Sequence, residues 1–236
     1  MSQEIKGIFF DFGGTLFDFY PSNSEIWANV AKRLGVDIKP SDPRIQHGMR
    51  KQSQAFEKLG KPWSELSSDE IHTLNCQVLK TLGIETEGTK ETIDAEFSAR
   101  EQGELFTIYP DTLETLQKIK ELELKIGIVS NVGGKLALSR RPTLEENGIL
   151  QYFDTIILSG EVGVLKPEKE IFDIALREIR IKDPAKVMHV GDNPIEDVWG
   201  ARNAGLIPVF FDPMELFSTE NVIKIKTLSD ILPYLK

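Results

Sequence analysis

The chain has 236 residues, of which 40% are hydrophobic and 28% are charged, and its formal net charge is −9. This length and composition are typical of a globular protein with a well-buried core, built as one large domain or as a core domain with an insertion. The negative charge predicts no nucleic-acid partner. No apolar run approaches the roughly 20 residues that span a bilayer, so no membrane partner is expected either.

The first residues and the cysteine content indicate a reducing compartment. The N-terminal residues lead directly into a strand-like run, without a basic region or a cleavage site, so we expect no secretory leader. Cys76 is the single cysteine and cannot form an intramolecular disulfide. Its place in an amphipathic pattern favours a small, partly buried apolar side chain over a reactive thiol. We therefore expect a cytoplasmic protein.

Five short apolar runs predict parallel strands that are buried on both faces. These runs end on serine or aspartate and cover residues 7–11, 125–130, 155–159, 186–192 and 207–212. Helical stripes lie between them, for example over 113–122 and 171–179. Alternating strands and helices predict an α/β fold with a doubly wound, Rossmann-like parallel sheet. Open sheets of this kind place their ligands at the carboxyl ends of the strands.

Residues 20–104 show helical periodicity in place of strand-like runs. Ser22 with Glu25, and Ser67 with Glu70, have the spacing of capping boxes, and each pair precedes an apolar stripe closed by a glycine. Further stripes around 45–56 and 93–97 predict two more helices. We therefore expect an α-helical cap domain over residues 20–104. The core domain would comprise residues 1–19 and 105–236.

Four short segments carry polar residues at three strand ends and at one helix start. They are Asp11-Phe12-Gly13-Gly14-Thr15-Leu16, Ser130-Asn131, Leu165-Lys166-Pro167 and the run Gly191 to Asp197. Taken singly, each has an ordinary structural explanation: Asp11 could cap a turn, and Lys166 could be a solvated loop residue. The two later aspartates could be acids favoured at a helix N-terminus. Their order and joint placement favour a functional interpretation.

In these four segments the sequence resembles the haloacid dehalogenase (HAD) superfamily, in the form that carries a helical cap between the first two motifs. The resemblance extends to connecting segments such as Tyr109-Pro110-Asp111 and Tyr152-Phe153-Asp154. It implies a hydrolase with Asp11 as covalent nucleophile, most often on a phosphate monoester. A carboxylate can attack phosphorus in line to form an acyl phosphate, which water then hydrolyses. The expected partner is thus a small phosphorylated substrate, while the sequence leaves the oligomeric state open.

The resemblance also assigns roles to the other motif residues. Asp11, Asp192 and the carbonyl of Gly13 would hold Mg²⁺, a hard ion that prefers about six oxygens, and Asp197 would orient a water on that ion. Lys166 would offset the paired carboxylates and contact the phosphoryl oxygens. The phosphate site would comprise Ser130, Asn131, Gly14 and Thr15, with backbone N–H groups near Phe12, Gly13 and Asn131 as donors. Gly14 would permit the tight turn after the nucleophile.

Gly13 departs from the pattern of the family's phosphatases. Those enzymes usually carry a second aspartate there, two residues after the nucleophile, which protonates the leaving alkoxide and later activates water. General acid–base catalysis contributes about 10²–10⁴-fold, so the difference matters for the reaction. Asp18, in the segment that leaves the core, is a possible substitute.

Two other functions remain open at this point. A 2-haloacid dehalogenase also lacks the second aspartate, but it attacks carbon without a metal and usually has a neutral residue in place of Asp192. Dehalogenases also place an arginine early in the cap, whereas the first arginine of this chain is Arg33. The other alternative is a weakly active regulatory protein that binds a phosphorylated ligand. Retention of Asp11, Lys166 and Asp192 favours the metal-dependent phosphatase.

Overall fold

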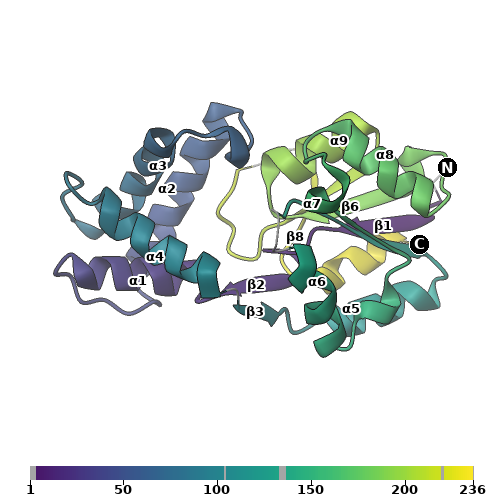
Figure 1. Cartoon of the computed structure of the whole chain (residues 1–236), viewed down its shortest axis with the longest axis horizontal. Helices are drawn as coiled ribbons and strands as arrows, with labels where there is room; N and C mark the ends of the chain where they lie inside the picture. The colour runs from purple at the N-terminus through teal and green to yellow at the C-terminus, as the bar shows by residue number, and fades with distance from the viewer. Residues whose placement is uncertain (1–3, 104, 133–136, 219–220, 236) are drawn as a thin grey trace. The chain divides into compact units, whose positions relative to one another are not determined.

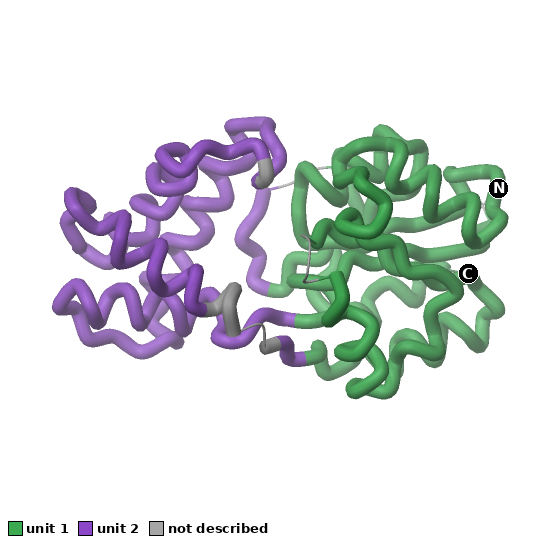
Figure 2. The backbone as a smooth tube through the Cα atoms, viewed as in Figure 1, with its two compact units in different colours: residues 1–17, 108–213, 219–236 green, residues 18–107, 214–218 purple. Residues whose placement is uncertain are grey.

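The structure, a computed structural model, describes residues 4–103, 105–132, 137–218 and 221–235. The chain forms two compact units, which Figure 2 shows in different colours. The core unit comprises residues 1–17, 108–213 and 219–236, and the helical unit comprises residues 18–107 and 214–218. None of the helices in the described part of the chain is long and apolar enough to cross a membrane.

The core unit is built on a six-stranded parallel sheet with the strand order β5-β4-β1-β6-β7-β8. Its strands are β1 (Gly7–Phe10), β4 (Lys125–Ser130), β5 (Thr155–Leu158), β6 (Val187–Gly191), β7 (Ile207–Phe211) and β8 (Ile223–Ile225). The doubly wound, Rossmann-like sheet predicted from the apolar runs is confirmed. The central strands β1, β4 and β6 are buried along almost their whole length, as expected for strands covered on both faces.

Strand β1 occupies the position in the sheet where the winding reverses. The chain leaves β1 to form β4 and β5 on one side, then returns to form β6, β7 and β8 on the other. Phe10 at the end of β1 is in register with Ile128 of β4 and with Val190 of β6. The segments that follow β1, β4 and β6 therefore meet at one edge of the sheet, at the switch point where such folds bind ligands.

Helices cover both faces of this sheet (Figure 1). On one side α8 (Lys169–Glu178) and α9 (Gly200–Ala204) pack against the strands through a cluster that includes Phe9, Val129 and Phe172. On the other side lie α5 (Thr112–Glu121) and the C-terminal 3-10 helix Leu228–Leu235. The core unit also contains α6 (Ala137–Glu146), α7 (Ser159–Val162), the π-helix Pro194–Trp199 and 3-10 helices at Leu150–Tyr152 and Pro184–Lys186.

The helical unit contains α1 (Asn23–Arg33), α2 (Pro43–Leu59), α3 (Ser68–Leu82) and α4 (Lys90–Gly103), with a 3-10 helix at Trp63–Glu65. Both predicted capping boxes are present, with Ser22 and Glu25 before α1 and Ser67 and Glu70 before α3. A two-stranded sheet of β2 (Phe17–Tyr20) and β3 (Leu105–Ile108) lies where the chain enters and leaves this unit. The sequence pattern did not predict these two strands, which are only four residues long.

Candidate active site

Asp11 lies directly after β1, at the carboxyl edge of the sheet. Its backbone N–H donates to the carbonyl of Val190 at 2.9 Å, which extends the pairing with β6 by one residue. Its side chain is only 12% exposed and accepts hydrogen bonds from the Lys166 ammonium at 2.7 Å and from the Ser130 side chain. The predicted nucleophile is thus held by one residue from the end of β4 and by one from the segment before α8.

The turn after Asp11 brings its backbone close to Asp192. Gly14 has φ +76°, and a Cβ at this position would lie 2.2 Å from Asp192 Oδ2. Only glycine fits such a site, on conformation and on space. The turn is closed by the Gly14 N–H, which donates to the Phe17 carbonyl at 2.7 Å. Thr15 is fully buried, and its hydroxyl lies 3.5 Å from Asp192 Oδ1, so its side chain faces the second aspartate.

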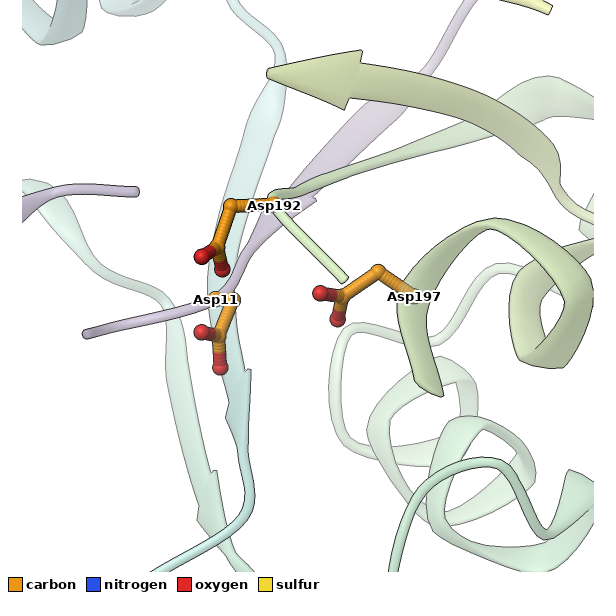
Figure 3. A group of neighbouring side chains, drawn as sticks. All are labelled: Asp11, Asp192 and Asp197. Atoms are coloured by element: carbon orange, nitrogen blue, oxygen red, sulfur yellow. The ribbon is translucent and has the colours of Figure 1, made fainter. Parts of the chain in front are cut away.

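Three carboxylates gather at the ends of β1 and β6 (Figure 3). Asp11, Asp192 and Asp197 each offer an oxygen, and these atoms lie within 4.8 Å of one another. Asp197 belongs to the π-helix after β6 and packs against Gly191, where a Cβ would lie 2.1 Å from Asp197 Cγ. Single-turn π-helices are rare and occur frequently at functional sites.

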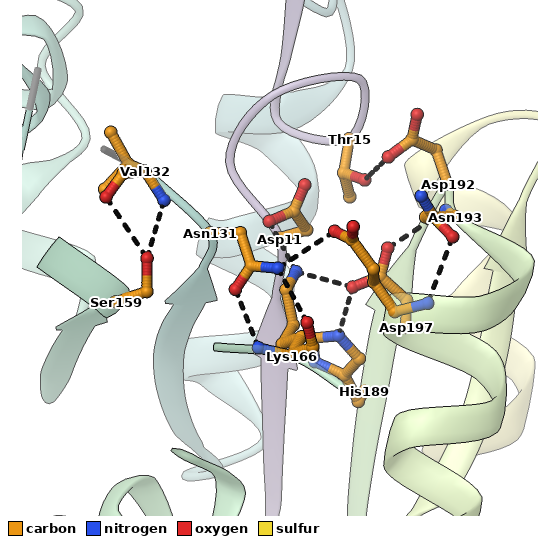
Figure 4. Close-up of polar contacts among 11 residues, drawn as sticks. Asp11, Thr15, Asn131, Val132, Ser159, Lys166, His189, Asp192, Asn193 and Asp197 are labelled. Carbon is orange, nitrogen blue, oxygen red and sulfur yellow. Dashed lines mark hydrogen bonds and ion pairs between the residues drawn. The ribbon is translucent and has the colours of Figure 1, made fainter. Parts of the chain in front are cut away.

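Lys166 is the cation among these carboxylates. Its side chain is 1% exposed, and its Nζ donates to Asp11 Oδ1 at 2.7 Å and to Asp197 Oδ1 at 2.6 Å (Figure 4). Burial alone would lower the pKa of this ammonium, but the charges of Asp11 and Asp197 raise it above its usual value. Lys166 is therefore a fixed positive charge at neutral pH.

The three aspartates differ in the direction of their pKa shifts. Burial raises the pKa of Asp11, against the pull of Lys166, and raises that of Asp192 well above its usual value, with the charge of Asp11 adding to the effect. Burial also acts on Asp197, but Lys166 and His189 hold its pKa below the usual range. One lysine thus leaves Asp11 and Asp192 short of positive charge. An all-oxygen donor set with this deficit fits a hard divalent cation.

Asn131, predicted to lie in the phosphate site, uses its side chain to hold the backbone of Lys166. Its Oδ1 accepts from the Lys166 N–H at 2.7 Å, and its Nδ2 donates to the Lys166 carbonyl at 2.9 Å. Nδ2 also donates to Glu196 Oε2 at 3.0 Å. The side chain therefore positions the predicted catalytic lysine, while the backbone N–H stays a predicted donor to substrate.

Three further residues complete the site, and the sequence analysis assigned them no role there. Ser159 accepts from the Val132 N–H at 2.9 Å and donates to the Val132 carbonyl at 3.1 Å, which fixes the segment after β4 (Figure 4). Glu196 contacts Asn131, and burial raises the pKa of its carboxyl to about 7. His189 is fully buried in β6 and contacts Asp197. Ser159 ends a predicted strand, a signal that could have marked it, but the other two have no local signal.

The structure brings the predicted residues Asp11, Gly14, Thr15, Ser130, Asn131, Lys166, Asp192 and Asp197 to one edge of the sheet. Gly13 lies in the turn after Asp11 and forms a bridge with Phe17. Asp18, considered as a substitute acid, belongs to the helical unit and accepts a hydrogen bond from the Phe19 N–H at 2.9 Å. Its part in catalysis remains a hypothesis.

A Rossmann-like sheet with a buried aspartate after β1, a buried lysine and two acids after β6 is the arrangement expected of a hydrolase with an aspartate nucleophile. The chain belongs to the haloacid dehalogenase-like hydrolase family, whose family model matches residues 5–205. The resemblance inferred from the four motifs is confirmed.

Curated relatives include several phosphatases. The chain is 35% identical to the pyrimidine 5'-nucleotidase YjjG of Escherichia coli (strain K12) over 54% of this chain, and the match spans only 55% of that relative's length. It is 31% identical to an uncharacterized hydrolase of Schizosaccharomyces pombe, over 85% of this chain and 88% of the relative. A glyceraldehyde 3-phosphate phosphatase of Methanothermobacter thermautotrophicus is 29% identical over 86% of this chain and 83% of the relative.

Solved structures share the fold over nearly the whole chain. The HAD-hydrolase YfnB of Bacillus subtilis, solved bound to magnesium, superposes with a TM-score of 0.64 at 17% identity, covering 98% of this chain and 99% of that chain. A 2-haloacid dehalogenase of Pseudomonas syringae superposes with a TM-score of 0.56 at 22% identity, with 98% of both chains covered. At these identities the likeness concerns the fold alone.

Proposed function

We propose that this hydrolase is a Mg²⁺-dependent phosphatase that acts on a small phosphate monoester through an aspartyl-phosphate at Asp11. The observation that carries the proposal is the position of Asp192 beside Asp11. Both carboxyl pKa values are raised, and Lys166, the described lysine that contacts Asp11, is already shared between Asp11 and Asp197. A divalent cation would supply the missing positive charge.

Asp11 and Asp192 would hold the cation directly, together with the carbonyl of Gly13. Asp197 suits an outer position, because Oδ1 already accepts from Lys166 and His189 and Oδ2 accepts from the Asn193 N–H at 3.0 Å. The ion would neutralise charge on the phosphate and so lower the repulsion between two anions. From that outer position, Asp197 would orient a water molecule bound to the ion.

The residues of the chain would carry out the two chemical steps. An oxygen of Asp11 bonds to phosphorus while the bond from phosphorus to the ester oxygen breaks, and that oxygen leaves with the bonding electrons and takes a proton from solvent water to become the alcohol. Water then attacks the aspartyl-phosphate, which releases inorganic phosphate and restores the carboxylate. Lys166 and Ser130 both contact Asp11 and would stabilise the charge on the phosphoryl oxygens during both steps.

The relatives support a small phosphorylated substrate. The bacterial and archaeal proteins named above are a pyrimidine 5'-nucleotidase and a glyceraldehyde 3-phosphate phosphatase, both of which cleave phosphate monoesters. The magnesium in the Bacillus subtilis structure supports the choice of ion. We also propose that the helical unit is the cap domain, with boundaries near residues 20 and 104. The reason is that this unit begins directly after the turn that follows Asp11.

One observation favours a second candidate, a 2-haloacid dehalogenase. Gly13 provides no carboxyl group for protonating a leaving alkoxide, and dehalogenases, two of which share this fold, have no need of one. Such an enzyme would attack a carbon atom with Asp11 and release halide without a metal. Asp192 weighs against this candidate, because a second acid beside the nucleophile would only add repulsion.

A single assay separates the candidates. The wild-type protein is incubated with p-nitrophenyl phosphate or with 2-chloropropionate, in Mg²⁺ or in EDTA, and phosphate and chloride release are measured. Phosphate release that EDTA abolishes and Mg²⁺ restores would support the phosphatase. Chloride release in EDTA would replace it with the dehalogenase, and binding of phosphate without turnover would indicate a regulatory protein. Asp11→Asn should abolish turnover with the fold intact, and beryllofluoride should occupy wild-type Asp11.

A further inference from the structure

His189 lies at the centre of the sheet, yet it carries a polar ring. It is the third residue of β6, and its exposed fraction is 0%. The Phe172 ring packs against it edge-on, with the two ring centroids 5.0 Å apart. Its Nε2 lies 2.8 Å from Asp197 Oδ1. Its Nδ1 has no hydrogen-bond partner among the residues that the structure describes. Among the described residues, only one of the two ring nitrogens is therefore paired.

The proton of this imidazole can be assigned from its neighbours. Asp197 Oδ1 also accepts from the Lys166 ammonium at 2.6 Å, so the carboxylate is ionised and can only accept hydrogen bonds. A proton must therefore lie on Nε2, and Nδ1 carries a lone pair because burial lowers the pKa of the ring and favours its neutral form. An apolar side chain would fill this place without burying an unpaired nitrogen, so packing alone does not explain a histidine here.

The N–H of His189 acts on the carboxylate that holds Lys166. Asp197 Oδ1 receives two donors, Lys166 Nζ and His189 Nε2, while Oδ2 receives the Asn193 N–H. Three donors from three segments fix the rotation of the carboxylate. That rotation in turn determines where Lys166 Nζ lies between Asp197 and Asp11.

We propose that His189 is a positioning residue for the lysine of the active site: it orients Asp197, and Asp197 holds Lys166 against Asp11. Without the Nε2 donor, Asp197 could rotate, and Lys166 would lose its fixed place beside the nucleophile. The geometric part stands on the described contacts, whereas its effect on turnover rests on the proposed phosphatase function.

Four variants separate positioning from packing. His189→Leu fills the space without a donor, and His189→Gln places an amide nitrogen about where Nε2 lies. His189→Asn is polar but too short to reach Asp197, and Phe172→Leu loosens the packing around the ring while it keeps the donor. For hydrolysis of p-nitrophenyl phosphate in saturating Mg²⁺, we expect kcat to fall about tenfold in the Leu and Asn variants with KM nearly unchanged. His189→Gln should recover to within about threefold of wild type, and Phe172→Leu should lower the melting temperature but not kcat.

The same variants can be tested without turnover. In ¹⁵N-labelled protein at pH 7, the ring of His189 should show its proton on Nε2, and the buried Lys166 ammonium should give a slowly exchanging signal. That signal should disappear in His189→Leu and His189→Asn and persist in His189→Gln. A proton on Nδ1, or an unchanged Lys166 signal in His189→Leu, would overturn the proposal whether or not the protein is a phosphatase. An unchanged kcat in His189→Leu, or a Gln variant as slow as the Leu variant, would overturn its kinetic part.

Discussion

The ion pairs of the helical unit and the buried cluster around Lys166 in the core unit place their charges in opposite surroundings. In the helical unit the ion pairs lie at the surface, as with Lys61 and Glu70, which are 2.9 Å apart with side chains 47% and 32% exposed. In the core unit Lys166 makes contacts of similar length to Asp11 and Asp197, with its side chain 1% exposed. The distances barely differ, but the surroundings do.

Solvent decides what each kind of pair contributes. Water and salt screen an exposed pair, so that either partner can be replaced with little effect on folding. A buried group is unscreened, and the loss of one partner leaves a charge that neither water nor protein compensates. The buried cluster around Lys166 is therefore tolerated only as a complete set, and it forms the candidate active site.

The largest expected difference between the two regions comes from replacing one lysine in each. Lys166→Met should reduce turnover to background and lower the free energy of unfolding by about 3–5 kcal/mol in EDTA, because Asp11 and Asp197 lose their shared cation. Lys61→Met, the matched control, should leave turnover unchanged and shift the unfolding midpoint only slightly, because its ion pair is exposed. Urea denaturation and phosphate release measure both. A Lys166 variant as stable as the control would mean that Asp11 and Asp197 are neutralised by another route.

The next largest effect concerns Gly13, where the core unit carries no acid. Aryl phosphates leave as phenolates and need little protonation, whereas alkyl phosphates leave as strongly basic alkoxides. The missing acid is worth about 10²–10⁴-fold, so we expect kcat/KM for p-nitrophenyl phosphate to exceed that for an alkyl phosphate clearly. Gly13→Asp should narrow the difference if its carboxyl group reaches the leaving oxygen. Equal rates on both substrates in the wild type, with chemistry rate-limiting, would show that another group donates the proton.

One glutamate in each unit has a shifted pKa, and the two shifts have opposite directions. Burial raises the pKa of Glu196 in the core unit from 4.5 to about 7, and hydrogen bonds from Lys61 and Ser67 lower that of Glu70 in the helical unit to about 2. The folded protein binds the Glu196 proton more tightly than the unfolded chain does. This stabilisation is complete below pH 4.5 and is lost as pH rises through 7. The Glu70 contribution is present above pH 4.5 and is lost as pH falls toward 2.

Glu196→Gln should therefore stabilise the metal-free protein at pH 8, by up to about 3 kcal/mol relative to wild type, and should flatten the fall in stability between pH 4.5 and 7. Asp11 and Asp192, whose pKa values are also raised, should leave part of that slope in place. Glu70→Gln should lower stability slightly above pH 4.5 and make no difference in strong acid, where Glu70 of the wild type is itself protonated. Denaturation in EDTA across pH 3–8 measures both variants. A Glu196 variant less stable than wild type at pH 8 would contradict the raised pKa.

The smallest expected effect is confined to the helical unit. The Ser67 hydroxyl accepts the Glu70 N–H and starts α3, so Ser67→Ala should cost about 1 kcal/mol of stability. It should leave kcat unchanged, because the described hydrogen bonds of this cap join only Ser67 and Glu70. Ser130→Ala is the converse, since it removes a donor to Asp11 and should lower kcat more than stability. A Ser67 variant with reduced kcat would mean that the helical unit acts on the chemistry through its folding.

Features that depend on neighbouring residues could be predicted from the sequence. Both capping boxes form from residues three apart, and the strands follow apolar runs, so local chemistry suffices for these elements. The motif residues were also predictable, because Asp11, Ser130 and Asp192 each stand at the end of such a run. The short strands β2 and β3 were not, because each exists only through its pairing with the other.

Only the tertiary structure decided which partner each site residue takes. Lys166 lies 155 residues from Asp11 and 31 from Asp197, and it is the strand order around β1 that brings all three together. The same order turns the Asn131 side chain to the Lys166 backbone and gives the buried His189 a carboxylate to orient. Sequence patterns report burial and local hydrogen bonding, which act over a few residues. Contacts among buried charges depend on which strands lie side by side, and that arrangement is a property of the whole fold.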